Sequence, residues 1–84
     1  MTILYVGSSP EAYMECAKED NLTIITASNG LEALNILKNR NDINTIISNY
    51  NLPGNNGIFL YDQINEDSHL CRIPFILVSE EFNN

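Results

Sequence analysis

The stretch IISNYNLPGNNG, residues 46–57, has the pattern of a buried strand that runs out into a turn. The two isoleucines at its start are β-branched and apolar, as in a strand that is covered on both faces. Pro53 fixes φ and Gly54 permits positive φ, which predicts a type II turn after the strand. In an open α/β sheet, ligands bind where such a strand ends. Asn49 occupies that position, so the candidate functional site carries a neutral amide.

Short apolar runs and helical patterns alternate on both sides of this stretch. Asn29 with Glu32 three residues later resembles a capping box, which marks a helix start. The alternation βαβαβαβ predicts a parallel sheet with right-handed crossovers. Four strands are expected: Thr2–Val6, Leu22–Ala27, a strand that ends at Asn49, and Phe75–Val78. Three helices are expected: one that starts at Ser9-Pro10, one that starts at Asn29, and one over Ile58–Asn65. The apolar side of the second helix consists of Leu31, Leu34, Ile36 and Leu37.

Composition restricts the class of protein and its partners. With 84 residues, the chain is a single small domain over residues 1–84, or a piece of one. The net charge is −7, and the four basic residues form no run, which argues against binding of nucleic acid or of an acidic membrane surface. No apolar stretch approaches the roughly 20 residues of a membrane helix, and the start lacks the basic region of a signal peptide.

The cysteines and the single histidine show no metal-binding spacing. Cys16 and Cys71 lie far apart without a CxxC motif, so neither a disulfide framework nor a zinc site is expected. Both are predicted to be small buried or half-buried apolar residues in a reducing cytoplasm. His69 is isolated in an acidic loop and is predicted to be exposed.

Four segments, in order along the chain, are similar to the motifs of one family. Ile3–Val6 is followed by a short turn and Pro10; Ala27–Leu34 is similar to A-x-x-G-x-E-A-L; Leu52–Gly57 is similar to L-P-x-M-D-G; and Ile73–Ser79 is similar to I-P-[VI]-I-x-L-[TS]. On these motifs the chain resembles the CheY-like receiver domain of two-component response regulators. The resemblance implies a three-layer, flavodoxin-like α/β fold with strand order 2-1-3-4 and without the last helix-strand-helix.

The resemblance also identifies the positions that carry chemistry in that family. Asn49 stands where the family has the aspartate that accepts a phosphoryl group. Gly7 and Ser8 stand where the family has the acidic pair that holds magnesium, and Ser79 matches the hydroxyl that senses the phosphate. The family's conserved lysine would lie after a fifth strand, beyond the end of this chain.

These replacements predict a degenerate receiver that is not phosphorylated. Formation of an aspartyl phosphate needs a carboxylate nucleophile, and magnesium is held by carboxylates and phosphate oxygens. With Gly7, Ser8 and Asn49 in place, neither an enzymatic activity nor a metal or other cofactor is expected. Ser79 then has an ordinary alternative role, in which its hydroxyl caps a helix or bonds to the backbone.

The expected function is cytoplasmic signalling through protein contact. Without the last three elements, the fourth strand would be an open edge and one face would be half uncovered. We expect a protein partner or a second copy of the chain to bind there. Three alternatives stay open: a phosphotransfer-competent receiver with an atypical site, a small α/β nucleotide-binding enzyme, and a remnant without a function of its own. The nucleotide-binding enzyme has little support, because residues 6–10 contain one glycine and no lysine and so do not form a phosphate-binding loop.

Overall fold

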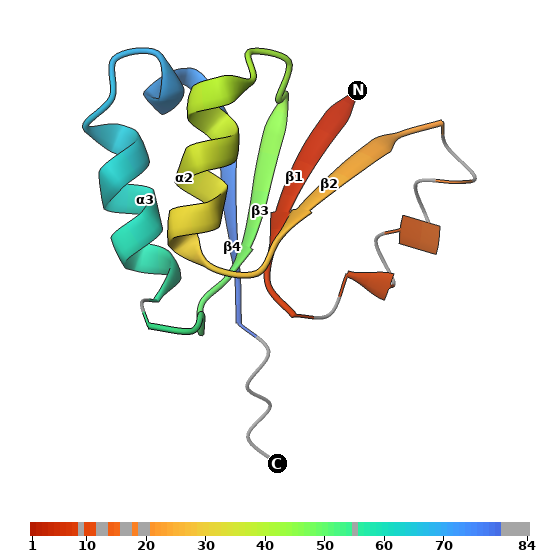
Figure 1. Cartoon of the computed structure of the whole chain (residues 1–84), viewed down its shortest axis with the longest axis horizontal. Helices are drawn as coiled ribbons and strands as arrows, with labels where there is room; N and C mark the ends of the chain where they lie inside the picture. The colour runs from red at the N-terminus through yellow and green to blue at the C-terminus, as the bar shows by residue number, and fades with distance from the viewer. Residues whose placement is uncertain (9, 12–13, 16–17, 19–20, 55, 80–84) are drawn as a thin grey trace.

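A four-stranded parallel sheet forms the centre of the fold (Figure 1). The computed structural model describes residues 1–8, 10, 11, 14, 15, 18, 21–54 and 56–79. The strands are β1 (Thr2–Val6), β2 (Thr23–Ala27), β3 (Thr45–Asn49) and β4 (Phe75–Val78), and the other elements are α2 (Gly30–Asn39), α3 (Gly57–Asn65) and the 3₁₀ helix η1 (Leu70–Arg72). The strand order is β2-β1-β3-β4, and every pairing is parallel, which confirms the order and direction expected from the sequence.

Helices α2 and α3 lie side by side on one face of the sheet (Figure 1). They connect β2 to β3 and β3 to β4, so the chain moves in the same direction across the sheet at both crossovers. Right-handed crossovers in the same direction place their helices on the same face. Most of the helix expected to start at Ser9-Pro10 lies outside the described residues, including Ser9 itself.

The hydrophobic core fills the space between this sheet face and the two helices. Leu4 and Val6 of β1 point to the same face as Ile46 of β3, because residues two apart on a strand share a face. Ala33, Leu37, Leu60 and Ile64 meet them from the helices. Within the described residues, no helix is both long enough and apolar enough to cross a membrane.

Asparagine side chains cap both of these helices. Asn29 Oδ1 accepts a hydrogen bond from the Glu32 backbone N–H at 2.8 Å, as the capping-box pattern predicts. The carboxylate of Glu32 accepts from Ser28 Oγ at 3.0 Å. At α3, Asn56 Oδ1 accepts from the Phe59 N–H at 2.9 Å. Asn29 and Asn56 are therefore both helix caps.

The turn before η1 is held by Asp67. Its Oδ1 atom accepts hydrogen bonds from the backbone N–H of His69 at 2.8 Å and of Leu70 at 3.0 Å. The hydrogen bond from Leu70, and to a smaller extent the one from His69, lowers the pKa of the Asp67 carboxyl below its ordinary value of 3.8.

We expect Asp67 to make the folded protein sensitive to acid. Because the pKa is lower in the folded state, the stabilisation is fully present above about pH 4 and is lost as the pH falls through the folded-state pKa. Asp67→Asn keeps an acceptor oxygen but does not titrate. Urea unfolding between about pH 5 and pH 2 should show a steeper loss of stability for the parent chain than for the variant. Parallel pH profiles would contradict this prediction.

Candidate functional site

The four residues that the resemblance singles out lie at one edge of the sheet. Gly7 and Ser8 follow β1, Asn49 ends β3, and Ser79 follows β4. Because the strands are parallel, their carboxyl ends meet at the lower edge in Figure 1. Asn49 is only 4% exposed and Gly7 is buried, whereas Ser8 and Ser79 are exposed. The fold thus brings these positions to the same edge but leaves only two of them buried.

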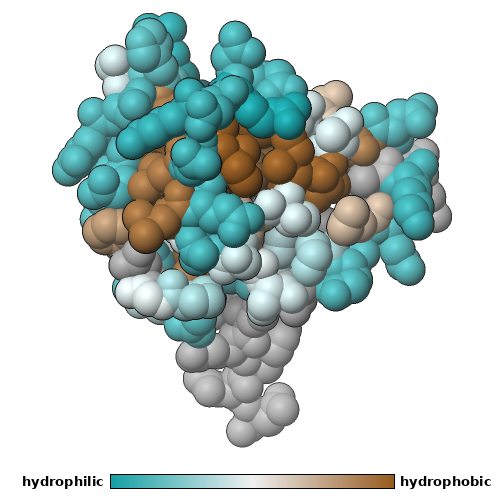
Figure 2. Space-filling model, in the orientation of Figure 1, coloured by the Kyte–Doolittle hydropathy of each residue, from teal (hydrophilic) through white to brown (hydrophobic). Residues whose placement is uncertain are grey.

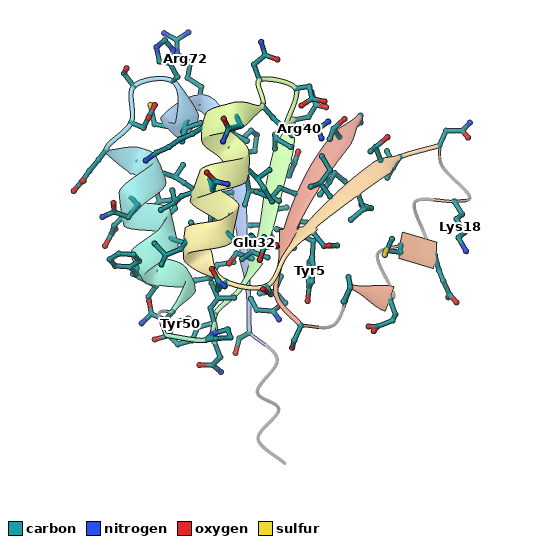
Figure 3. The ribbon with its side chains drawn as sticks, viewed as in Figure 1. Tyr5, Lys18, Glu32, Arg40, Tyr50 and Arg72 are labelled. Carbon is teal, nitrogen blue, oxygen red and sulfur yellow. The ribbon has the colours of Figure 1, made fainter. Side chains whose placement is uncertain are left out.

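Tyr5 is the direct partner of Asn49, and the sequence reasoning missed it. Its hydroxyl donates a hydrogen bond to Asn49 Oδ1 over 3.3 Å. The Tyr5 side chain is completely buried and points toward the carboxyl end of β1 (Figure 3). A tyrosine among the aliphatic residues of β1, two residues before Gly7, was the available signal. A buried phenol needs a polar partner, which Asn49 supplies here.

Gly7 has no room for a side chain. A Cβ atom at this position would lie 2.6 Å from Tyr5 Oη and 2.8 Å from Asn49 Cγ, and still closer to Asn49 Nδ2. All of these distances are shorter than real Cβ contacts. The absence of a side chain at Gly7 therefore allows the phenol and the amide to meet.

The loop after β3 is fixed by local backbone chemistry. Gly54 has φ +79°, in agreement with the turn predicted from Pro53-Gly54. The Gly57 N–H donates to the Tyr50 carbonyl at 2.6 Å and starts α3 directly beneath the strand end. Ser48, also fully buried, donates from Oγ to the Asn49 carbonyl at 3.0 Å. The carbonyl groups of Asn49 and Tyr50 at the strand end are thus both hydrogen-bonded.

The site is electrically neutral in the part of the chain that the structure describes. Tyr5, Gly7, Ser8, Asn49 and Ser79 supply hydroxyl and amide groups but no carboxylate. Among the described residues, no three His, Cys, Asp or Glu side chains lie close enough to hold a metal ion together. The site can accept and donate hydrogen bonds, but it provides neither an anionic nucleophile nor the hard anionic oxygens that magnesium prefers.

The described basic residues lie away from this edge. Arg40 and Arg72 are at the opposite end of the sheet, and Lys18 is at the side (Figure 3). Arg40 is engaged by Asp42 through Nε–Oδ1 and Nη2–Oδ2 contacts of 2.9 and 2.7 Å. This hydrogen-bonded partner raises the pKa of Arg40 and lowers that of Asp42. These cations are therefore not placed to bind an anion next to Asn49.

Two further predictions from the sequence have different outcomes. His69 is exposed next to η1, as expected. The prediction that Cys71 is buried or half-buried is wrong: Cys71 is an exposed free cysteine, and its thiol lies 3.6 Å from the Ser68 carbonyl. It is on the outer side of η1, where Leu70 takes the buried position. Cys16 lies outside the described residues.

An apolar hollow of about 180 Å³ lies between α3 and β4. Its lining consists of Ile58 and Tyr61 from the helix and Phe75 and Leu77 from the strand. The rings of Tyr61 and Phe75 meet edge to face, with their centroids 5.3 Å apart. Beyond this hollow, Figure 2 shows a band of hydrophobic residues that runs across the α2–α3 face, bordered by hydrophilic ones.

Solved structures of receiver domains superpose on most of the chain. A response regulator receiver protein from Pseudomonas putida matches with a TM-score of 0.86 at 20% identity, covering 98% of this chain and 69% of that one. The chemotaxis response regulator CheY4 of Vibrio cholerae matches with a TM-score of 0.83 at 21% identity, covering 98% and 70%. The receiver domain of a sensor histidine kinase from Pseudomonas aeruginosa was solved with magnesium in its active-site cleft. It matches with a TM-score of 0.77 at 20% identity, covering 90% of this chain and 64% of that one.

These matches define the class of the fold. The chain has the CheY-like receiver fold, with the strand order 2-1-3-4 that the sequence predicts. The solved chains are longer, and this chain spans about two thirds of their length. No protein-family model matches the sequence, and the comparison with curated proteins finds no match.

Proposed function

We propose that the chain is a degenerate receiver-like module of two-component signalling, which acts through protein contact in the cytoplasm and is not phosphorylated. In this proposal, Asn49 is the inactive counterpart of the phosphoacceptor. Gly7 and Ser8 are the counterparts of the acidic pair, and Ser79 is that of the switch hydroxyl. The observation that carries the proposal is that Asn49 is buried against a phenol, and that none of the described site residues carries a carboxylate.

The chemistry of the site supports this interpretation. An amide oxygen is neutral and its nitrogen lone pair is delocalised, so neither atom replaces a carboxylate as the nucleophile for phosphoryl transfer. With Asn49 only 4% exposed, a phosphoryl donor would also have to displace the surrounding side chains before reaching it. The module therefore has neither the acceptor nor the open approach that phosphorylation requires, and it needs no cofactor.

We expect the unaltered chain to remain unmodified by acetyl phosphate. Intact-mass spectrometry after incubation with acetyl phosphate and Mg²⁺ should show no added mass of about 80 Da, the size of a phosphoryl group. A receiver domain that carries the acceptor aspartate is the positive control. A mass gain in this chain that disappears in Asn49→Ala would overturn the proposal, because it would locate a phosphoryl group at the amide position.

The surface over α3 and β4 is the proposed docking surface. It consists of the hollow lined by Ile58, Tyr61, Phe75 and Leu77 and of the open edge of β4 beside it. Leu77 is 42% exposed beside the hollow, and Ile76 is 49% exposed on the opposite face of the sheet, because consecutive residues of a strand point to opposite faces. Large apolar side chains left exposed on both faces of an edge strand are typical of an interaction surface.

A second copy of the chain is the occupant that we propose for this surface. Within the described residues, β4 pairs with β3 alone and forms an edge of the sheet. The sequence of β4, Phe-Ile-Leu-Val, contains no charge, proline or glycine, which are the features that usually protect an edge strand. Two identical edges can pair antiparallel about a two-fold axis. The net charge of −7 opposes this association, so added salt should strengthen it.

We expect Leu77→Asp to weaken self-association because it places a charge in the apolar contact. Light scattering over a wide range of concentrations should show the parent chain approaching twice the monomer mass, and more so at high salt. The variant should remain near the monomer mass. Leu31→Asp is the matched control, because Leu31 is 70% exposed on α2 and does not line the hollow. A monomeric parent at all concentrations, or equal effects of the two substitutions, would contradict this assignment of the surface.

A further inference from the structure

We infer that Tyr5 closes the site at the end of β3, by filling the space that a side chain at position 7 would need. This inference deepens the part of the proposed function that excludes phosphorylation, and it does not depend on the docking surface. It assigns a role to a residue outside the four positions given by the resemblance. The loss of the acidic residues then accounts for only part of the inactivity, because the site is also physically occupied.

The packing around Tyr5 carries the inference. Tyr5 and Gly7 are two residues apart on the same extended segment, so their side-chain directions coincide. The phenol therefore extends along the strand into the space above Gly7, where a Cβ atom would lie 2.6 Å from Oη. The same hydroxyl donates to Asn49 Oδ1, and Asn49 Cγ would lie 2.8 Å from that Cβ atom. Tyr5, Gly7 and Asn49 thus form one packed unit.

Because the three residues pack together, the residue at position 5 decides how much space remains between Gly7 and Asn49. A small residue at position 5 would leave a buried space between Gly7 and Asn49, into which a cation and its ligands could fit. With Tyr5 present, a carboxylate at position 49 would face a buried phenol and have little access to water or metal, even with a second carboxylate at the exposed position 8. We therefore expect that acidic substitutions alone do not create a cation site, and that shortening Tyr5 is also required.

Metal titration tests this expectation with a matched pair of variants. Both carry Ser8→Asp and Asn49→Asp and keep Gly7, and only the second also carries Tyr5→Val. Calorimetric titration with Mn²⁺, on samples shown to be folded by circular dichroism, should give at least tenfold tighter binding to the variant with valine. Equal affinities for the two variants would overturn the inference. Absence of binding to both would overturn it as well, because removing the ring would then not have opened the site.

A stability measurement tests the same packing without any metal. Gly7→Ala is compared in the Tyr5 background and in the Tyr5→Phe background, which removes only the hydroxyl. Urea unfolding should show a large drop in the midpoint when alanine is added beside tyrosine, and a clearly smaller drop beside phenylalanine. Equal drops would contradict the role of the Tyr5 hydroxyl. These results are independent of acetyl phosphate labelling, so the inference and the proposed function can fail separately.

Discussion

Leu60→Ala is expected to lower the free energy of unfolding by about 3 kcal/mol, within the usual range for a buried leucine in a core. Leu60 is 0% exposed and belongs to the cluster that joins α3 to the sheet. The substitution removes apolar contacts and leaves a cavity that the neighbouring strands can fill only in part. Because domains of this size are stable by only about 5–10 kcal/mol, a large fraction of the total would be lost. Urea unfolding followed by circular dichroism measures the change.

Leu31→Ala is the matched control for this substitution. It makes the same chemical change on the other helix, but Leu31 is 70% exposed. The expected change in the free energy of unfolding is within about 0.5 kcal/mol. Similar losses for Leu31→Ala and Leu60→Ala would show that the two helices do not pack on the sheet as described.

Gly57→Ala is expected to lower the free energy of unfolding by about 2–3 kcal/mol, because the added methyl group overpacks the junction of β3 and α3. A Cβ atom there would lie 2.5 Å from the Asn49 carbonyl oxygen and 2.5 Å from Leu77 Cδ1. The first of these contacts is with backbone, which cannot move without shifting the end of the strand. The change should therefore also disturb Asn49 and the wall of the hollow formed by Leu77. Urea unfolding measures the decrease in the free energy of unfolding. Amide chemical shifts show whether the structure changes around both Asn49 and Leu77.

Gly54→Ala separates backbone strain from overpacking. Gly54 has φ +79° and nothing within 4 Å of a Cβ at that position, so alanine adds strain but no collision. We expect a loss of about 1 kcal/mol, the usual cost of left-handed backbone for a residue with a side chain. If Gly57→Ala were no more harmful than Gly54→Ala, the close approach at the start of α3 would have no energetic importance.

The sequence pattern identifies one of the two central residues of the candidate site but not the other. Asn49 can be identified because a β-branched run ends there and Leu-Pro-Gly follows. Tyr5 cannot be identified in this way, because a tyrosine in a strand is as common as any other aromatic residue in that setting. Its role depends on a contact across 44 positions of sequence, which only the pairing of β1 with β3 creates.

Gly57 and Cys71 illustrate the same limit. Asn56-Gly57 has the composition of a turn, yet Asn56 caps a helix and Gly57 is required by a close approach to β3. Cys71 has the character of a small buried residue, but it faces outward because its neighbour Leu70 fills the core position. In the same way, Leu31 fits the apolar periodicity of α2 but lies beyond the area that the sheet covers.

The sequence by itself determined the order of the elements, the parallel sheet, the helix cap at Asn29 and the neutral character of Asn49. These properties follow from local chemistry: apolar runs of strand length, capping side chains, and the special backbone preferences of proline and glycine. The tertiary structure alone decided that Tyr5 meets Asn49 above Gly7, and which apolar residues remain exposed beside β4. Those outcomes depend on the distances between segments that are remote in the chain, and a pattern of residue types does not contain these distances.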